Sequence, residues 1–284
     1  MSTFDPERLL AWQIPDIRQA WGPRENALYA LSVGMSHDPL DPGQLRYTAG
    51  VGGWRTLPGM AFILGHPGFW AADPGTGIDV VRLVHGEESA EILAPLPSEG
   101  EILARNRVIG LADKGAEKGA VMYVEKTLVN TATDTVLARV IRTSFLRGNG
   151  GFGGTLGRAP RPLAAPQGTP DHVRIIDTRP EQALLYRWKG DPNPLHFDPA
   201  LAARAGFRQP ILHGLCSLGA AAQQVMGLLG NWDNNLVRAI SGRFTAVVHP
   251  GEQLEISIWN DGGFRVRVPE RDAIVINNGK VQLA

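Results

Sequence analysis

The sequence contains a single cysteine, which limits the chemistry available to it. Cys216 stands alone among 284 residues, so the chain forms no internal disulfide and no zinc site built from several thiolates. Its neighbours in LHGLCSLGAAA are small or apolar, as is typical of a buried, unreactive thiol. We therefore expect a reducing, cytoplasmic compartment and no catalytic role for this thiol.

The sequence also lacks an excess of either charge and any long apolar run. Lys and Arg together number 28, as do Asp and Glu, so no net field attracts the chain to nucleic acid or to an anionic membrane. The opening MSTFDPERLL does not resemble a leader, and no apolar run approaches the ~18 residues of a membrane span. We expect neither nucleic acid nor membrane as a partner.

Glycine and proline divide the chain into two halves. Residues 146–171 read LRGNGGFGGTLGRAPRPLAAPQGTPD, where no hydrophobic period continues. We place an N-terminal half at residues 1–155, a linker at 156–170 and a C-terminal half at 171–284. The glycine cluster at 148–154 could cradle a phosphate, but it lacks the Lys-Ser/Thr of a P-loop. A flexible turn is the prediction there.

Each half carries β-branched runs that predict antiparallel strands. The second half also has a long apolar segment, Ile211 to Leu229, which predicts a helix buried on nearly all faces. The expected fold class is α+β, with a sheet wrapped around a central helix. The predicted strands include 121–129, 136–145, 254–259, 264–268 and 273–276.

The first half contains a weaker copy of the same plan. LPGMA at residues 57–61 aligns with LHGLC at 212–216, and the turn at 96–101 resembles that at 248–252. YALSVGMSHDPLDP, starting at Tyr29, aligns with YRWKGDPNPLHFDP, starting at Tyr186. The His and Asp of the first segment stand in different places, so only the second half is expected to perform chemistry.

The segment GDPNPLHFDP, residues 190–199, is the strongest functional motif. Two prolines restrict its backbone and hold Asp191 and His196 on a stiff, turned loop. Asn193 is expected to keep the loop in shape by bonding to nearby backbone, a direct substrate contact being the less favoured role. Asp198 is expected to cap a short helix that Gly206 ends.

This arrangement suits the addition of water to a conjugated thioester. The reaction requires a base for the water, a proton for the α-carbon and stabilisation of charge on the thioester oxygen. Asp191 and His196 would hold the water, and the backbone N–H of Gly214 would meet the oxygen at the positive end of the long helix. His213, just before Gly214, is predicted to be a satisfied structural group.

Tyr186 to Ala220 resembles the signature of the 2-enoyl-coenzyme A hydratase 2 family, which is related to MaoC-type dehydratases. In the first half, HGEESAEILAPLPSEGE and RGNGGFGG are similar to segments of its two-half members that accept long acyl chains. The resemblance implies a double hot dog fold, with two antiparallel sheets that each wrap a central helix. It also implies catalytic Asp191 and His196, an oxyanion-hole Gly214 and a (3R)-3-hydroxyacyl-CoA product.

The same resemblance implies that the first half shapes a tunnel for the acyl tail and has lost its own catalytic pair. The expected partner is an acyl-CoA thioester substrate, and the chain is expected to form a homodimer. We expect no cofactor and no metal.

Three other functions stay open at this point. A thioesterase on the same type of fold would release a free thiol, and a non-catalytic acyl-CoA-binding protein would keep the fold without turnover. His196 and Asp198, with His249 further on, also have the look of a two-His-one-carboxylate iron site of an oxygenase. That last reading leaves Asp191 and both prolines unexplained.

Overall fold

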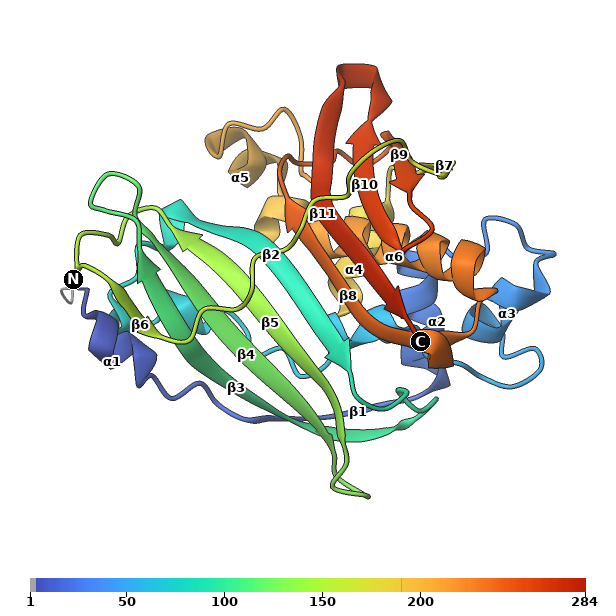
Figure 1. The fold of residues 1–284 in the computed structure, drawn as a ribbon, viewed down its shortest axis with the longest axis horizontal. Helices are drawn as coiled ribbons and strands as arrows, with labels where there is room; N and C mark the ends of the chain where they lie inside the picture. Colours follow the sequence, from blue (N-terminus) through green and yellow to red (C-terminus); the bar gives the residue numbers. More distant parts are fainter. Residues whose placement is uncertain (1–3, 190) are drawn as a thin grey trace.

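The computed structural model describes residues 4–189 and 191–284, so Gly190 of the motif lies outside the described residues (Figure 1). Its strands form one antiparallel sheet in the order β1-β3-β4-β5-β2-β8-β11-β10-β9-β7, with β6 beside β3. The strands are β1 Ile17–Trp21, β2 Leu83–Ile92, β3 Gly100–Asp113, β4 Ala120–Asn130, β5 Val136–Leu146, β6 Thr155–Gly157, β7 His172–Asp177, β8 Val237–Phe244, β9 Gln253–Ile258, β10 Gly263–Val268 and β11 Ala273–Leu283.

Most helices lie at the N-terminus and in the connections before β2 and before β8, and η8 lies between β10 and β11. The α-helices are α1 Pro6–Leu10, α2 Pro23–Ser32, α3 Pro42–Thr48, α4 Gln182–Tyr186, α5 Pro199–Arg204 and α6 Gly214–Gly230. The 3-10 helices are η1 Pro58–Phe62, η2 Trp70–Ala72, η3 Pro74–Thr76, η4 Val80–Arg82, η5 Arg187–Lys189, η6 Pro194–His196, η7 Asn234–Leu236 and η8 Pro269–Arg271. Within the described ranges, no helix has both the length and the apolar character that crossing a membrane requires.

The sheet repeats one strand arrangement twice. The first half runs β1-β3-β4-β5-β2 from its edge inward, and the second half runs β7-β9-β10-β11-β8. The second strand of each half therefore lies at the centre, where β2 pairs antiparallel with β8. The internal repeat predicted from the sequence is confirmed. The two halves share one continuous sheet through this pairing, whereas the prediction had described two sheets.

Charged side chains cross the junction between the halves. Arg243 of β8 bonds Glu87 of β2 at 2.5 Å, and the neighbouring Glu88 is 2% exposed. Arg142 and His85 bond the Glu88 carboxylate at 3.1 and 2.6 Å. Burial alone would raise the pKa of Glu88, but these two partners outweigh it and lower the pKa to about 2. The junction thus holds an ionised carboxylate at neutral pH.

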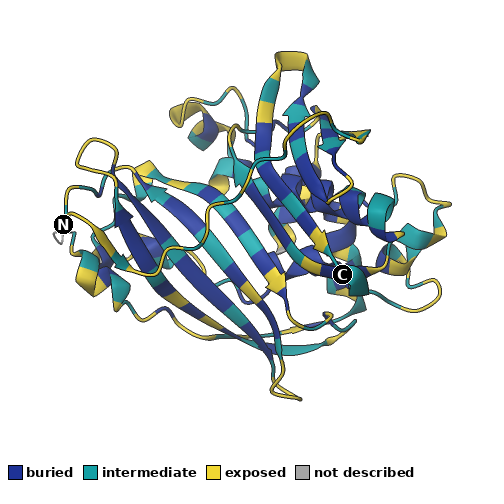
Figure 2. Cartoon of the chain, in the orientation of Figure 1, coloured by how far each residue is buried: buried dark blue, intermediate teal, exposed yellow. Residues whose placement is uncertain are grey.

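Helix α6 is the central helix of the second half and packs on β8, β10 and β11. Figure 2 shows it buried behind these strands. It begins at Gly214, three residues later than predicted, because the preceding backbone is held by strand-like contacts. Leu212 donates its N–H to the carbonyl of Val248 at 2.7 Å. The helix ends before Asn231, whose φ of 46° is left-handed.

The first half has no such helix at the aligned position, which corrects the expectation of a central helix in each half. LPGMA forms only the short 3-10 helix η1. The chain then turns at Gly65, with φ +64°, where a Cβ would lie 2.1 Å from the Cβ of Ala104. Pro67 follows two residues later and also prevents a longer helix. Helix η1 of the first half packs against α6. The long helix of the second half is therefore in contact with both halves.

Predicted and observed strands agree closely in β4, β5, β9 and β10, where each end differs by at most one residue. The run predicted at 273–276 extends to Leu283 in β11. Strands β1, β2, β6, β7 and β8 were not among the predicted ones, and β3 follows the turn predicted at 96–101. In β2 the alternating burial pattern depends on Glu88, a charged residue that only its tertiary partners make compatible with burial.

The linker crosses one face of the sheet on its way to β7 (Figure 1). Asn278 of β11 donates its side-chain N–H to the carbonyl of Leu163 at 2.7 Å. The preceding glycine cluster wraps around Asp113, whose carboxylate accepts the N–H groups of Gly151 and Gly153 at 2.9 and 2.6 Å. These amides are therefore engaged by a carboxylate of the chain itself. The domain boundaries at 155 and 171 stay predictions.

Candidate active site

The motif forms a short loop stabilised by its own polar side chains. Asn193 caps η6, since its side-chain oxygen accepts the N–H of Leu195 at 3.1 Å. The carboxylate of Asp191 accepts the N–H of Asn193 at 3.1 Å. These bonds give Asn193 a structural contact within the loop and orient the carboxylate of Asp191.

Asp198 has the structural role that the sequence predicted. Its carboxylate accepts the N–H groups of Ala200 and Leu201 at 2.8 and 3.2 Å, at the start of α5. Helix α5 ends at Arg204, and Ala205 is its C-cap. Gly206 follows with a left-handed φ of +86°. The Asp198 carboxylate is therefore occupied as the N-cap of α5, and it holds this helix in place directly after the motif.

His196 is buried, with 8% of its surface exposed. Its Nδ1 lies 2.9 Å from the carbonyl oxygen of Ile211. A carbonyl oxygen only accepts, so Nδ1 carries the proton and Nε2 presents a lone pair. Burial lowers the pKa of His196 below its ordinary value, although the Ile211 carbonyl and Asp191 oppose the shift. The ring is therefore neutral at pH 7, with Nε2 free to accept a hydrogen bond.

His213 joins His196, contrary to the prediction that it is a satisfied structural group. The imidazoles of His196 and His213 stack with their centroids 3.7 Å apart and their planes at 26°. The ring of Tyr186 also packs against His213, with a centroid distance of 4.9 Å. Within the described residues, neither ring nitrogen of His213 has a hydrogen-bond partner. Burial and the neighbouring His196 lower the pKa of His213 to about 3, so it too is neutral.

Asp191, His196 and His213 converge in one place. Each offers a nitrogen or oxygen that lies within 4.8 Å of those of the other two. Burial alone would raise the pKa of Asp191, but the two imidazoles and the N–H of Asn193 outweigh it and lower the pKa. At neutral pH the site therefore presents one carboxylate and two neutral imidazoles in a mostly buried position.

The three groups are also the one set among residues 4–189 and 191–284 whose ligand atoms could surround a metal ion. The suggested iron set fails, because neither Asp198 nor His249 belongs to it. Two imidazoles ligate one ion through lone pairs that lie in their ring planes and converge. The face-to-face stacking of His196 and His213 directs these lone pairs along nearly parallel planes, which fits a metal poorly.

The start of α6 completes the site. Gly214 is its first residue, and His213 supplies no side-chain cap. The first N–H groups of a helix have no partner inside it and carry the positive end of its dipole. A Cβ on Gly214 would lie 3.1 Å from the ring of Phe244, so this position has little room for a side chain. The structure thus places Gly214 directly after the histidine that stacks on His196.

Two family models match the chain, one in each half. Residues 20–148 match the MFE-2 hydratase 2 N-terminal domain, and residues 162–278 match the MaoC like domain. The crystal structure of a MaoC-like dehydratase from Phytophthora capsici superposes with a TM-score of 0.86 at 30% identity, covering 98% of each chain. The fold and the site define a two-half protein of the MaoC-like, double hot dog class.

Curated relatives narrow this class to one family. Enoyl-CoA hydratase ChsH3 of Mycobacterium tuberculosis is 36% identical, over 97% of this chain and 97% of its own length. The peroxisomal enoyl-CoA hydratase 2 of Arabidopsis thaliana is also 36% identical, over 97% of this chain and 94% of its own. The chain belongs to the enoyl-CoA hydratase 2 family.

Proposed function

We propose that this chain is a hydro-lyase that adds water reversibly to a trans-2-enoyl-CoA and forms a (3R)-3-hydroxyacyl-CoA. The observation that carries the proposal is the meeting of Asp191 and His196 beside the uncapped start of α6. The relatives named enoyl-CoA hydratases support the substrate class and the reaction.

Asp191 and His196 can hold one water molecule in the orientation that attack requires. The carboxylate accepts one hydrogen of the water, and the lone pair on Nε2 of His196 accepts the other. With both hydrogens engaged, a lone pair on the water oxygen is free to attack the β-carbon of the substrate. The pKa values of both groups are lowered from their ordinary values, which keeps the groups in these accepting forms at neutral pH.

The proton and electron balance then follows. The water oxygen bonds to the β-carbon while one water proton passes to the Asp191–His196 pair, and the electrons of the double bond move toward the thioester oxygen. The N–H of Gly214, at the positive end of α6, stabilises the charge on that oxygen. A proton returned to the α-carbon completes the addition, and dehydration is the same path reversed.

One incubation panel tests this function. Trans-2-enoyl-CoA esters of graded chain length are supplied with and without a chelator, and the product and its configuration are identified. We expect (3R)-3-hydroxyacyl-CoA in both arms. Release of free thiol would indicate a thioesterase, binding without turnover would indicate an acyl-CoA-binding protein, and loss of activity with the chelator would favour a metal enzyme.

We also propose that the chain forms a homodimer. Edge strand β7 ends the sheet within the described residues, and it exposes Val173 and Ile175 at 53% and 58%. Exposed apolar side chains on a free edge favour association. Light scattering after gel filtration would test the mass in solution. The cytoplasmic location stays a prediction from the single cysteine.

A further inference from the structure

The guanidinium of Arg142 is a donor group that the proposed mechanism does not use. Arg142 lies on β5 directly opposite Glu88 of β2, and its Nε donates to the Glu88 carboxylate at 3.1 Å. Among residues 4–189 and 191–284, its terminal nitrogens have no hydrogen-bond partner. Its side chain is also 32% exposed, so these N–H groups are accessible to a ligand.

Arg142 and Glu88 lie on the face of the sheet that covers α6. Strands β5, β2 and β8 are neighbours in the sheet (Figure 1), and Glu88 stands opposite Gly242 of β8. Side chains directly opposite each other on neighbouring strands point to the same face. A Cβ on Gly242 would lie 2.9 Å from Leu218 of α6, about one turn after Gly214. The Arg142 side chain therefore lies on the side of the sheet where α6 begins.

A series of direct contacts connects this part of the first half with the start of α6. A β-bulge in β2 after His85 turns the His85 side chain to the same face as Glu88, and the two bond at 2.6 Å. The ring of His85 packs edge-on against Phe244, with a centroid distance of 4.9 Å. Phe244 in turn lies against Gly214, where a Cβ would be 3.1 Å from its ring. The charged pair of Glu88 and Arg142 is therefore close to the N–H that we assign to the thioester oxygen.

His66, in the loop after η1, is a second donor from the first half. Its Nδ1 accepts the N–H of Gly68 at 3.1 Å, so in the neutral ring Nε2 carries the proton. Burial lowers the pKa of His66 to about 4, although the nearby Asp191 and Glu88 oppose the shift. The ring is therefore neutral at pH 7 and presents an N–H near the reacting carboxylate.

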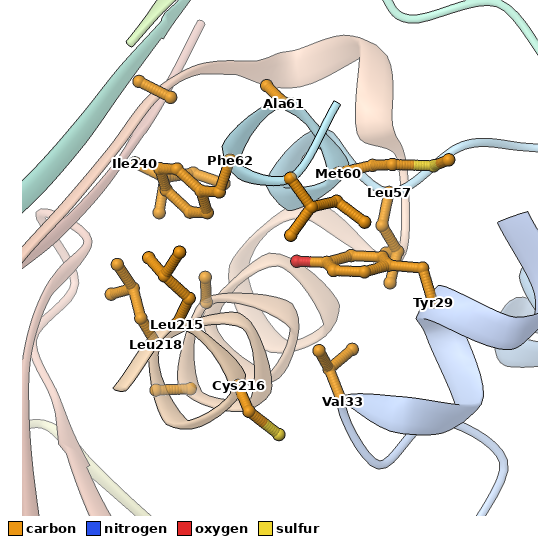
Figure 3. Close-up of a cluster of buried hydrophobic side chains, with 14 of the residues drawn as sticks. Tyr29, Val33, Leu57, Met60, Ala61, Phe62, Leu215, Cys216, Leu218 and Ile240 are labelled. Carbon is orange, nitrogen blue, oxygen red and sulfur yellow. The ribbon is translucent and has the colours of Figure 1, made fainter. Parts of the chain in front are cut away.

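Lys126 of β4 fixes the segment that carries His66. Its Nζ donates to the carbonyls of Phe62 and Leu64 at 2.9 and 2.7 Å, shortly before His66 in the chain. Figure 3 shows η1 beside α6, with the Phe62 ring among the apolar side chains that gather there. Lys126 thus holds η1, and with it the start of the His66 loop, on the side of the sheet where α6 lies.

The charges around Arg142 decide which kind of group it binds. Burial alone would lower the pKa of Arg142, but Glu88 and, more weakly, Asp191 outweigh it and raise the pKa. Arg142 therefore already faces two carboxylates, and Lys126, whose pKa burial lowers to about 7, offsets only part of the excess negative charge. A ligand carboxylate would add to this excess, whereas a neutral oxygen would not. Arg142 and Nε2 of His66 offer only N–H donors, so their complement is an acceptor oxygen.

We infer that Arg142 and His66 bind a carbonyl oxygen carried by the acyl chain, so that the preferred substrate is an oxo-substituted 2-enoyl-CoA. This inference rests on the proposed function, which places the thioester at Gly214 and the β-carbon beside Asp191. The oxo group stands on a carbon beyond the β-carbon and accepts hydrogen bonds from a terminal nitrogen of Arg142 and from Nε2 of His66. The phosphates of CoA do not reach these donors, because the pantetheine arm separates them from the thioester.

The test compares saturated acyl-CoA esters that carry an oxo group on the fourth, fifth or sixth carbon with the matching plain esters. Calorimetry gives their dissociation constants independently of turnover, and the trans-2-enoyl forms give kcat/KM. Succinyl-, glutaryl- and adipyl-CoA place a carboxylate at the same carbons and form the third arm. For at least one position we expect the wild-type protein to bind the oxo ester about tenfold more tightly than the plain one, the effect of a hydrogen bond from a charged donor.

Two variants remove the donors. Arg142→Met is combined with Glu88→Gln, because removing the guanidinium alone would leave a buried carboxylate without its main partner. His66→Leu removes only the imidazole, which leaves the Glu88 pair intact. Each variant should bind the plain esters as the wild type does and lose most of the preference for the oxo ester. The melting temperature of each variant shows whether it is folded.

Arg139→Met is the matched control. Arg139 also lies on β5 opposite a glutamate of β2, Glu91, with which it forms an ion pair at 3.7 Å. Both side chains of this pair are exposed, at 49% and 59%, and neither belongs to the site. This variant should keep the wild-type preference at every position of the oxo group.

Four outcomes decide the matter. A wild-type protein that binds oxo and plain esters equally at all three positions would show that the inference is wrong. Tighter binding of the carboxylate esters than of the oxo esters would overturn it in favour of an acid. A preference that survives in both His66→Leu and the double variant would place the oxygen elsewhere and would also refute it. If an oxo ester binds more tightly but no enoyl ester is hydrated, the binding site stands and the proposed function fails.

Discussion

Gly214→Ala tests the oxyanion role of the α6 N-terminus with the smallest possible change. The added methyl would lie 3.1 to 3.4 Å from the ring of Phe244, a tight contact that a shift of a few tenths of an ångström in this ring relieves. Ala also favours the helix over Gly by up to about 1 kcal/mol. These effects oppose each other, so we expect the free energy of unfolding to change by less than about 1 kcal/mol.

Activity should respond much more strongly than stability. Because the proposed function places the thioester oxygen at the Gly214 N–H, we expect a methyl on the same residue to obstruct its approach. Loss of one oxyanion donor lowers kcat by about a hundredfold to a thousandfold, or roughly 3 to 4 kcal/mol. The assay is kcat for hydration of a trans-2-enoyl-CoA at saturating substrate, together with urea unfolding of the same preparation.

Gly230→Ala, at the other end of the same helix, is the control. Its Cβ would meet Leu283 and Leu236 at ordinary distances of 3.7 and 3.8 Å, so kcat should stay at the wild-type value. If Gly214→Ala kept near-normal kcat with normal stability, the charge on the thioester oxygen would have to be stabilised elsewhere. Equal loss of activity in both variants would indicate a general effect on α6 and would refute the reasoning.

The remaining predictions concern the acid–base pair and the two halves. Asp191→Asn should lower kcat by on the order of a hundredfold or more while the melting temperature stays near normal, because the amide keeps the shape but cannot accept the water proton; near-normal turnover would exclude Asp191 as the base. His196→Ala should show a similar loss, and the double variant should be scarcely worse, since both residues hold one water; multiplicative losses would mean separate steps. Asp191 and His196 must both be deprotonated for activity, and both have lowered pKa values. We therefore expect kcat/KM to rise with pH only in the acid range and to be level from about pH 6.5 upward. A midpoint of this pH profile above about pH 6.5 would contradict the assignment. The fragment 171–284 alone should aggregate, as judged by gel filtration and circular dichroism, because exposing several hundred Å² of apolar surface on α6 and β8 costs several kcal/mol at ~25 cal/mol per Å². A folded fragment that turns over short but not long substrates would disprove the stability argument alone.

The local geometry of the motif was predictable from the sequence because it depends on neighbours in the chain. Proline restrains the backbone beside it, Asn193 bonds a group two residues away, and Asp198 caps the helix that it begins. The start of α6 at Gly214 was three residues from the predicted one, because Leu212 is held by Val248, a contact that no local pattern announces.

The sequence by itself determined the order of the two halves, the stiff loop with Asp191 and His196, and the apolar character of α6. Only the tertiary structure decided that His213 stacks on His196, that β2 and β8 join the halves in one sheet, and that η1 replaces a second long helix. The physical reason is the range of the interactions. Caps, proline restraints and hydrophobic periodicity act over a few residues, whereas the ring stacking, the strand pairing and the close contact of Gly65 with Ala104 join groups that meet only when the whole chain has folded.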